Sequence, residues 1–263
     1  MARNDVPPGL IKWAYREEWR EALDAALDAH FLPVCDEFDL EEDRLHEILG
    51  EAASAALWTC AFEDFATTDD ETRGVTIVDD YLKRRGWKES VSTRRYLEAL
   101  RGSVMSIHEV GEVAAADSFL ARDLVLGGEP VRVHDAAMSR VLKQGDTIAM
   151  RVLDISGRRR MSGGALLFEA PAAEKLRADL ALELAEMEKV ARAEPGALEA
   201  AAALRPGNEN PMRPLLLMEL APLVSFAWME HFLEDVPDEE RMRPAAPAER
   251  KPVPRPKGFH DWE

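Results

Sequence analysis

The hydrophobic and polar positions of this chain follow a helical repeat near its two ends and a two-residue alternation near its middle. Between Leu10 and Phe31, apolar residues recur every three or four positions, as in an amphipathic helix. Pro33 is expected to end this helix. Asp39 is a candidate N-cap for the next helix, with Glu42 as its capping-box partner. We therefore expect four helices in the first part of the chain, over residues 10–31, 39–65, 75–85 and 92–110.

The pattern changes near residue 118. Short apolar stretches are separated there by residues that favour turns, namely Gly127-Gly128, Gln144-Gly145-Asp146 and Ser156-Gly157. Between the last two turns, Ile148, Met150 and Val152 alternate with polar or small neighbours, which is the period of a strand. We expect strands over residues 118–126, 131–134, 147–155 and 159–168, the last with a break at Gly163-Gly164.

Helical periodicity returns after Pro171. Helices are expected over residues 172–192, 196–204 and 211–233. The last of these is apolar nearly all round, which is typical of a central core helix or of a surface that binds a partner. Pro222 is expected to kink it, because a hydrogen bond to the preceding turn is lost. Six prolines follow from Pro237 onward, and they predict an extended, polyproline-like tail.

These elements predict an α+β fold, mostly helical, with a small antiparallel sheet or barrel inserted between N-terminal and C-terminal helices. Four or five short strands within about 50 residues are enough for such a module. The expected regions are an acidic N-terminal helical region (1–112), a small antiparallel β module (113–170), C-terminal helices that pack on the rest (171–236) and a Pro-rich extended tail (237–263).

Charge divides the chain at nearly the same boundary as the secondary structure. The net charge is −17 over 263 residues. Residues 1–70 hold 5 lysines and arginines against 18 aspartates and glutamates, whereas residues 81–160 hold 15 against 10. The overall charge argues against non-specific binding of nucleic acid or an anionic membrane by the whole surface. An acidic face instead favours a basic partner.

Targeting and redox signals are few. The first residues contain no apolar segment of the kind found in signal peptides. The longest apolar stretch, residues 215–232, is interrupted by Glu219, Pro222 and Glu230, so we expect no membrane span. The two cysteines, Cys35 and Cys60, do not form a disulfide framework. A cytoplasmic location is expected.

Part of the β region resembles a small module that recurs in uncharacterised bacterial proteins. Some of those proteins also carry a C-terminal Cys-rich metal motif, which this chain lacks. The resemblance covers residues 118–168, about a fifth of the chain, and implies a barrel-like sheet without any attached activity. It rests on Phe119-Leu-Ala-Arg-Asp-Leu124, Gly127-Gly128-Glu129-Pro130-Val131-Arg132-Val133, Leu142-Lys-Gln-Gly145-Asp146 and Ile148-Ala149-Met150-Arg151-Val152.

The sequence offers few residues for a metal site. The clustered soft ligands are His30, Cys35, His46 and Cys60, and their spacing matches no common zinc knuckle. The acid run of residues 36–43 is interpreted as a solvated helix entry, where negative charge complements the helix dipole. We expect no bound metal and no cofactor.

Two pairs of adjacent carboxylates, Glu63-Asp64 and Asp79-Asp80, are candidates for acid–base chemistry. Adjacent side chains on a helix point about 100° apart, so neither pair is itself a catalytic dyad. Only the convergence of Asp64 with Asp80, or of the soft ligands above, would support a metal-dependent hydrolase. Ser162-Gly163-Gly164 is expected to be a strand bend and not a catalytic serine loop.

Two basic clusters are candidates for binding phosphate or nucleic acid. The first lies within residues 83–95, and the second adjoins the Ser156-Gly157 turn. Guanidinium groups at a hairpin tip suit contact with phosphate, and an indole ring can stack on a base. Pairing of these cations with the surplus acid of the chain is the competing interpretation. The candidate residues are Lys83, Arg84, Arg85, Trp87, Arg158, Arg159 and Arg160.

The tail offers a third candidate contact, through Arg255, Phe259 and Trp262. Basic polyproline followed by aromatic residues suits an aromatic-lined groove or, within the chain, the acidic helices. We therefore predict a non-enzymatic, cytosolic interaction or regulatory protein. It would recognise a protein partner, or a second copy of itself, through acidic helices or the tail. The alternatives are a nucleic-acid-associated protein that uses the basic clusters, and the metal-dependent hydrolase.

Overall fold

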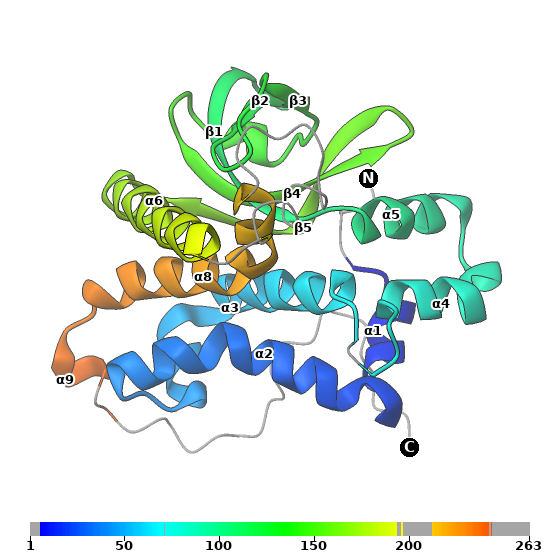
Figure 1. Ribbon diagram of the computed structural model, residues 1–263, viewed down its shortest axis with the longest axis horizontal. Coiled ribbons are helices and arrows are strands. Elements are labelled where there is room, and N and C mark those ends of the chain that lie inside the picture. Colours follow the sequence, from blue (N-terminus) through cyan, green and yellow to red (C-terminus); the bar gives the residue numbers. More distant parts are fainter. Residues whose placement is uncertain (1–5, 71, 194–195, 197–211, 242, 244–263) are drawn as a thin grey trace.

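The computed structural model describes residues 6–70, 72–193, 196, 212–241 and 243, and these form the predicted α+β fold (Figure 1). The strands are β1 (Met105–Ala114), β2 (Ser118–Asp123), β3 (Val131–Val133), β4 (Thr147–Ile155) and β5 (Arg158–Phe168). The helices are α1 (Pro8–Ala14), α2 (Glu17–Phe38), α3 (Glu42–Thr67), α4 (Ile77–Arg85), α5 (Val91–Arg101), α6 (Ala170–Ala193), α8 (Met212–Glu234) and α9 (Asp238–Arg241), with the 3₁₀ turns η1 (Gly86–Lys88) and η2 (Met138–Arg140).

The expected boundary between the first two long helices is wrong. Pro33 lies inside α2, which continues to Phe38 because its last turns pack into the core. Asp39 adopts the left-handed conformation, with φ of 50°, and ends α2 instead of capping α3. Glu41 is the N-cap of α3 and makes no side-chain cap bond, so the proposed capping box is absent.

The helix expected over residues 92–110 is also too long. It ends at Arg101, and residues 105–114 form β1. The helical signal in β1 arises because the strand is buried on both faces. Met105 and Ile107 pack against the helices, whereas Val110 packs inside the sheet. A strand of this kind lacks the alternation that marks a half-exposed one.

The five strands form one curled sheet in the order β3-β2-β1-β4-β5, in which all neighbours are antiparallel. The two edge strands approach each other, because His134 N donates a hydrogen bond to Arg159 O at 3.0 Å. The sheet is therefore a nearly closed barrel. Figure 1 shows it above the layer formed by α2, α3 and α8.

Three large apolar clusters, and a small fourth one around Ala191 and Met212, hold the described elements together. One lies inside the barrel around Phe119. A second joins α1, α2, α4 and α5 to α3, and includes Leu153 of β4. The largest joins α2, α3, α6 and α8 to the outer faces of β1, β4 and β5. β4 contributes to all three large clusters, through Ala149, Leu153 and Ile148, and so links the helices to the interior of the barrel.

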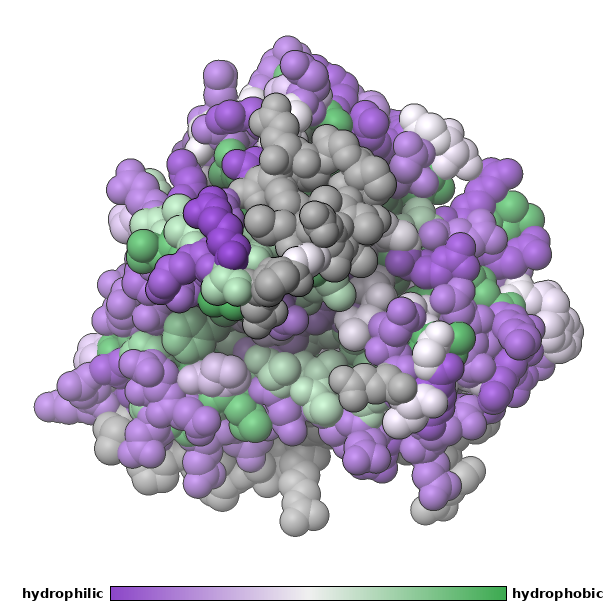
Figure 2. All heavy atoms as spheres, in the orientation of Figure 1, coloured by the Kyte–Doolittle hydropathy of each residue, from purple (hydrophilic) through white to green (hydrophobic). Residues whose placement is uncertain are grey.

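α8 is the core helix that its apolar pattern predicts. Leu220 and Val224 are fully buried in the largest cluster. Residues 215–234 are long and apolar enough to cross a membrane by length and composition, a test that a buried core helix also passes. Its outer side remains apolar, with Met218 67% exposed, and Figure 2 shows hydrophobic side chains gathered across the middle of this face of the molecule.

Two expectations concern the last part of the chain. The helix expected over 196–204 lies almost entirely outside the described residues. The tail was expected to be extended from Pro237, but Asp238–Arg241 form the short helix α9. The remainder of the tail lies outside the described residues.

A bulge in β5 sets the position of α3. Met150 pairs with Ala165 and Val152 with Met161, so Ser162–Gly164 lie opposite Arg151 alone. α3 approaches this bulge so closely that a Cβ on Gly164 would lie 2.9 Å from both the Cα and the N atom of Cys60. Only glycine allows this contact between helix and strand.

Replacing Gly164 by alanine is therefore expected to lower the free energy of unfolding by roughly 1–3 kcal/mol, the usual cost of overpacking. Urea denaturation measures this difference. Gly102→Ala is the matched control, because a Cβ on Gly102 would lie 4.0 Å from Ala99 O, which is an ordinary contact distance. Equal unfolding midpoints for the two variants would contradict the close approach.

Candidate functional site

A buried carboxylate occupies the bulge of β5. Glu63 of α3 is 0% exposed. Its Oε2 accepts a hydrogen bond from Ser162 Oγ at 2.6 Å, and its Oε1 accepts from the backbone N–H groups of Gly163 and Gly164 at 2.9 and 3.3 Å. Glu63 thereby replaces the strand partners that the bulge removes. Burial raises the pKa of this carboxyl to about 7, although the Ser162 hydrogen bond and the charge of Arg151 oppose the rise.

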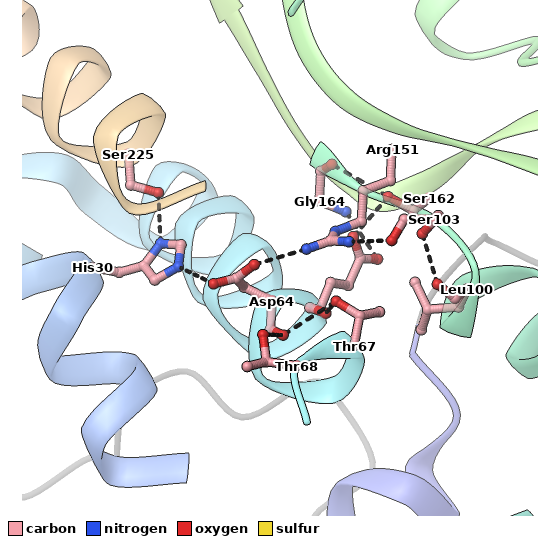
Figure 3. A network of polar contacts seen from close by, with 11 residues as sticks. His30, Asp64, Thr67, Thr68, Leu100, Ser103, Arg151, Ser162, Gly164 and Ser225 are labelled. Carbon is pink, nitrogen blue, oxygen red and sulfur yellow. Dashed lines mark hydrogen bonds and ion pairs between the residues drawn. The ribbon is translucent and has the colours of Figure 1, made fainter. Parts of the chain in front are cut away.

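Asp64, the next residue of α3, binds β4, which is the strand that pairs with β5. Arg151 of β4 is 2% exposed, and its guanidinium donates to Asp64 Oδ1 at 2.9 Å and to Ser103 O at 2.8 Å. Asp64 Oδ2 lies 3.5 Å from His30 Nε2, and His30 Nδ1 lies 2.8 Å from Ser225 Oγ. This chain of contacts joins α8, α2, α3 and β4 (Figure 3).

The hydrogen bonds of Glu63 hold α3 against β5 and are shielded from solvent. Glu63 and Ser162 are both buried, so a substrate cannot reach them. Sequence reasoning considered Glu63-Asp64 only as a catalytic pair and missed its partners. Two signals were present, since Glu63 stands three residues after Cys60 on the apolar stripe of its helix, and a glycine pair interrupts the facing strand. The Ser162-Gly163-Gly164 bend itself lies where expected.

The second carboxylate pair belongs to a different network. Asp80 Oδ2 accepts hydrogen bonds from the indole N–H groups of Trp13 and Trp19 at 2.8 and 3.2 Å. Asp80 Oδ1 pairs with Arg84 Nε at 2.8 Å. Because Asp64 and Asp80 are each committed to their own partners, the structure does not bring them together as the dyad of a hydrolase.

The soft ligands also have separate partners. His30 belongs to the Asp64 network, whereas His46 lies 3.2 Å from Ser54 Oγ. Cys35 and Cys60 are buried thiols, and burial raises the pKa of both. Within the described part of the chain, no group of three or more His, Cys, Asp or Glu side chains is placed to hold a metal ion.

The first basic cluster is partly neutralised by the chain itself. Arg84 pairs with Asp80 and, at 3.2 Å, with Glu18. Arg85 lies 5.6 Å from the ring of Trp13. Lys83 is exposed. Trp87 of η1 is 74% exposed, with Lys88 Nζ 5.0 Å from its ring.

The second basic cluster lies where expected, at the turn between β4 and β5. Arg158 and Arg159 are exposed and Arg160 is half-buried. A guanidinium nitrogen of Arg158 lies 3.2 Å from His134 Nδ1, at the end of β3. Cations on the outer faces of β2 and β3 are already paired, Arg122 with Glu109 and Arg132 with Glu112.

A row of outward-facing carboxylates lies on α2. Glu17, Glu21, Asp24 and Asp28, here called the acidic α2 face, point outward and line a shallow hollow of about 480 Å³ together with Arg20 and Ala25. Arg20 pairs with Asp24 at 3.8 Å, a long contact between exposed groups. Among the described residues, the other three carboxylates have no ion pair.

The acid run between the helices does not match the interpretation given to it. Glu42 and Asp43 do lie in the first turn of α3, where negative charge complements the dipole. Asp36 and Glu37, however, lie in the last turn of α2, where the dipole disfavours negative charge and no basic residue balances it. These two acids therefore do not serve to stabilise their helix. Arg255, Phe259 and Trp262 of the tail lie outside the described residues.

The fold and the network define an α+β protein in which helices are joined to a five-stranded barrel by the buried Glu63 and the half-buried Asp64. The chain belongs to DUF7986, a family of unknown function whose model matches residues 56–194. Residues 118–168, on which the resemblance to uncharacterised proteins rests, lie inside this segment. No curated protein and no solved structure matches the chain.

Glu63 predicts a specific dependence of stability on pH. Its pKa is about 7 in the folded chain against an ordinary value of 4.5, so its protonation stabilises the fold below pH 4.5. That contribution, on the order of 3 kcal/mol, is lost as the pH rises through 7. Glu63→Gln keeps the shape of the protonated acid and is expected to remove this slope.

Urea denaturation between about pH 5 and 8 measures the slope. The control is Glu183→Gln, which removes an exposed carboxylate of α6 and should leave the slope of the wild type unchanged. Parallel stability curves for Glu63→Gln and the wild type would show that Glu63 is ionised throughout, against the prediction.

Proposed function

We propose that this protein is a non-enzymatic interaction or regulatory protein whose acidic α2 face binds a Lys/Arg-rich segment of a protein partner. The observation that carries the proposal is the row of four outward carboxylates at spacings of four, three and four residues, three of them without an ion pair among the described residues. The buried networks support it indirectly, because their polar groups are occupied by internal contacts.

The geometry of the face suits a peptide. Residues 17–28 of a helix span roughly 16 Å at about 1.5 Å per residue. An extended segment of about five residues covers the same length. Ala25 and the exposed Leu32 add small apolar contacts beside the acids. A basic peptide lying along the helix would therefore meet charge along its whole length, and a slightly apolar strip beside it.

Binding of a fluorescent ten-residue Lys/Arg-rich peptide tests the proposal by anisotropy. Neutralising the face with Glu17→Gln, Glu21→Gln, Asp24→Asn and Asp28→Asn is expected to weaken binding at least tenfold and to flatten its salt dependence. The control removes the same charge from α6, with Glu174→Gln, Asp179→Asn, Glu183→Gln and Glu186→Gln. Equal losses for both variants would show attraction to net charge alone and would refute a specific face.

The tail is a competing occupant, because it carries Arg250, Lys251, Arg255 and Lys257. The same assay distinguishes the two cases in the full chain. If the tail covers the face, replacing these four residues by glutamine strengthens peptide binding. If an external partner is the occupant, the replacement leaves the affinity unchanged.

Nucleic-acid binding is the second candidate, and one observation favours it. The strands follow the order β1-β2-β3-β5-β4 around the barrel, with β3 and β5 running in the same direction, which is the topology of the OB fold. In OB folds the loop between the last two strands contacts oligonucleotides. Arg158 and Arg159 flank that loop here and are exposed. It ranks second because the neighbouring Arg122 and Arg132 are already paired.

Replacing Arg158, Arg159 and Arg160 by alanine is expected to abolish low-salt binding of a single-stranded oligonucleotide if this candidate is right, because phosphate contacts dominate such affinity. Electrophoretic mobility shift measures it. Arg192→Ala on α6 is the control for loss of an exposed cation. Unchanged affinity in the triple variant would eliminate the barrel tip as a nucleic-acid site.

A further inference from the structure

A cavity of about 160 Å³ lies between α6, α8 and the barrel. Its wall is mostly apolar and includes Ile107 of β1, Leu180 of α6 and Leu216 of α8. Two arginines, Arg177 and Arg213, are the charged residues among those that line it, and no carboxylate lines it within the described residues. The chain has 50 acidic residues that could pair with arginines. Two guanidinium groups that line a mostly apolar wall with no acid beside them are therefore unexpected.

Arg177 is held in a fixed position by neutral groups. Its Nε donates to Ala173 O at 3.2 Å, and a terminal nitrogen donates to Thr147 Oγ1 at 2.8 Å. Neither acceptor carries a charge. The guanidinium is therefore held at the wall of the cavity, although Arg177 as a whole is exposed to solvent, and it takes part in no ion pair among the described residues.

Arg213 is less satisfied still. Its Nε is buried and has no hydrogen-bond partner. It lies in the first turn of α8, where the helix dipole disfavours positive charge. Its Nη1 reaches the loop after β2, since a Cβ on Gly127 would lie 3.5 Å from it. An anion at this position would be stabilised both by Arg213 and by the first turn of the helix.

We propose that the cavity binds a small amphipathic anion, an acid whose charged head lies between Arg177 and Arg213 and whose apolar body lies against Ile107, Leu180 and Leu216. The size of the body follows from the volume, because a cavity of about 150 Å³ holds a benzene molecule. A body of about six carbon atoms therefore fits. The charged head is a carboxylate or a phosphate, since either pairs with guanidinium groups. This site is independent of the acidic α2 face.

The rise in melting temperature of the full chain with sodium hexanoate tests the proposal, alongside hexyl phosphate, 1-hexanol and acetate. We expect at least one of the two hexyl anions to stabilise the protein in a saturable way, and the tighter one identifies the head group. Hexanol and acetate, which each lack one half of the ligand, should have at most a tenth of that affinity. No saturable shift with either hexyl anion, or an equal one with hexanol, would overturn the proposal.

Arg213→Met supplies the matched variant, because it keeps the apolar stem and removes the charge. It is expected to weaken binding of the hexyl anion at least tenfold, whereas Arg192→Met, on the exposed side of α6, should leave it unchanged. A second result does not depend on any ligand. Without ligand, Arg213→Met should be as stable as the wild type or more stable, because an unpaired cation is removed. A clear loss of stability, or unchanged anion binding, would refute the site.

Discussion

The structure depends on the contact between two adjacent carboxylates of α3 and the two barrel strands β4 and β5. Glu63 binds the backbone of the β5 bulge, and Asp64 binds Arg151 of β4, which faces that bulge. A buried arginine is costly unless it is paired, and bulge N–H groups are costly unless they are bonded. Glu63 offsets the cost of the bulge N–H groups, and Asp64 offsets the cost of burying Arg151. Gly164 keeps α3 close enough to the strands for both contacts. This contact fixes the orientation of the helical layer on the barrel.

That arrangement separates structural chemistry from chemistry available to partners. Groups that resemble a catalytic set in the sequence, such as Asp64, Asp80, His30 and Ser162, are used in internal networks. The groups without partners are of another kind. They include Glu17, Glu21 and Asp28 of α2 and the two arginines of the cavity beside α6 and α8, which have no ion pair among the described residues, and such groups suit recognition of charge. This separation is the physical basis of the proposed binding function.

Much of the fold was predictable because most elements have one solvent-exposed face. β4 was predicted to the residue, and the fold class and the apolar core helix α8 are confirmed. β1 was not predictable by the same rule, because both its faces are buried and its pattern loses the two-residue period. The end of α2 was placed too early, at Pro33, because the packing of its last turns outweighs the one backbone hydrogen bond that proline removes. The network was missed because its contacts to α3 span 34 to 99 residues of sequence and the contact between His30 and Ser225 spans 195, so only the fold brings these side chains together.

The extent of the family match adds a last step. Residues 56–194 contain Glu63, Asp64, Arg151 and the β5 bulge, so the contact that fixes the architecture lies inside the family segment. The acidic α2 face lies before it and Arg213 lies after it. The flanking helices therefore add charged groups outside the matched segment. α2 and α8 also meet through His30 and Ser225, so both flanks are joined to the central network by the same imidazole ring. A ligand at either proposed site would therefore contact a helix that is joined directly to this network.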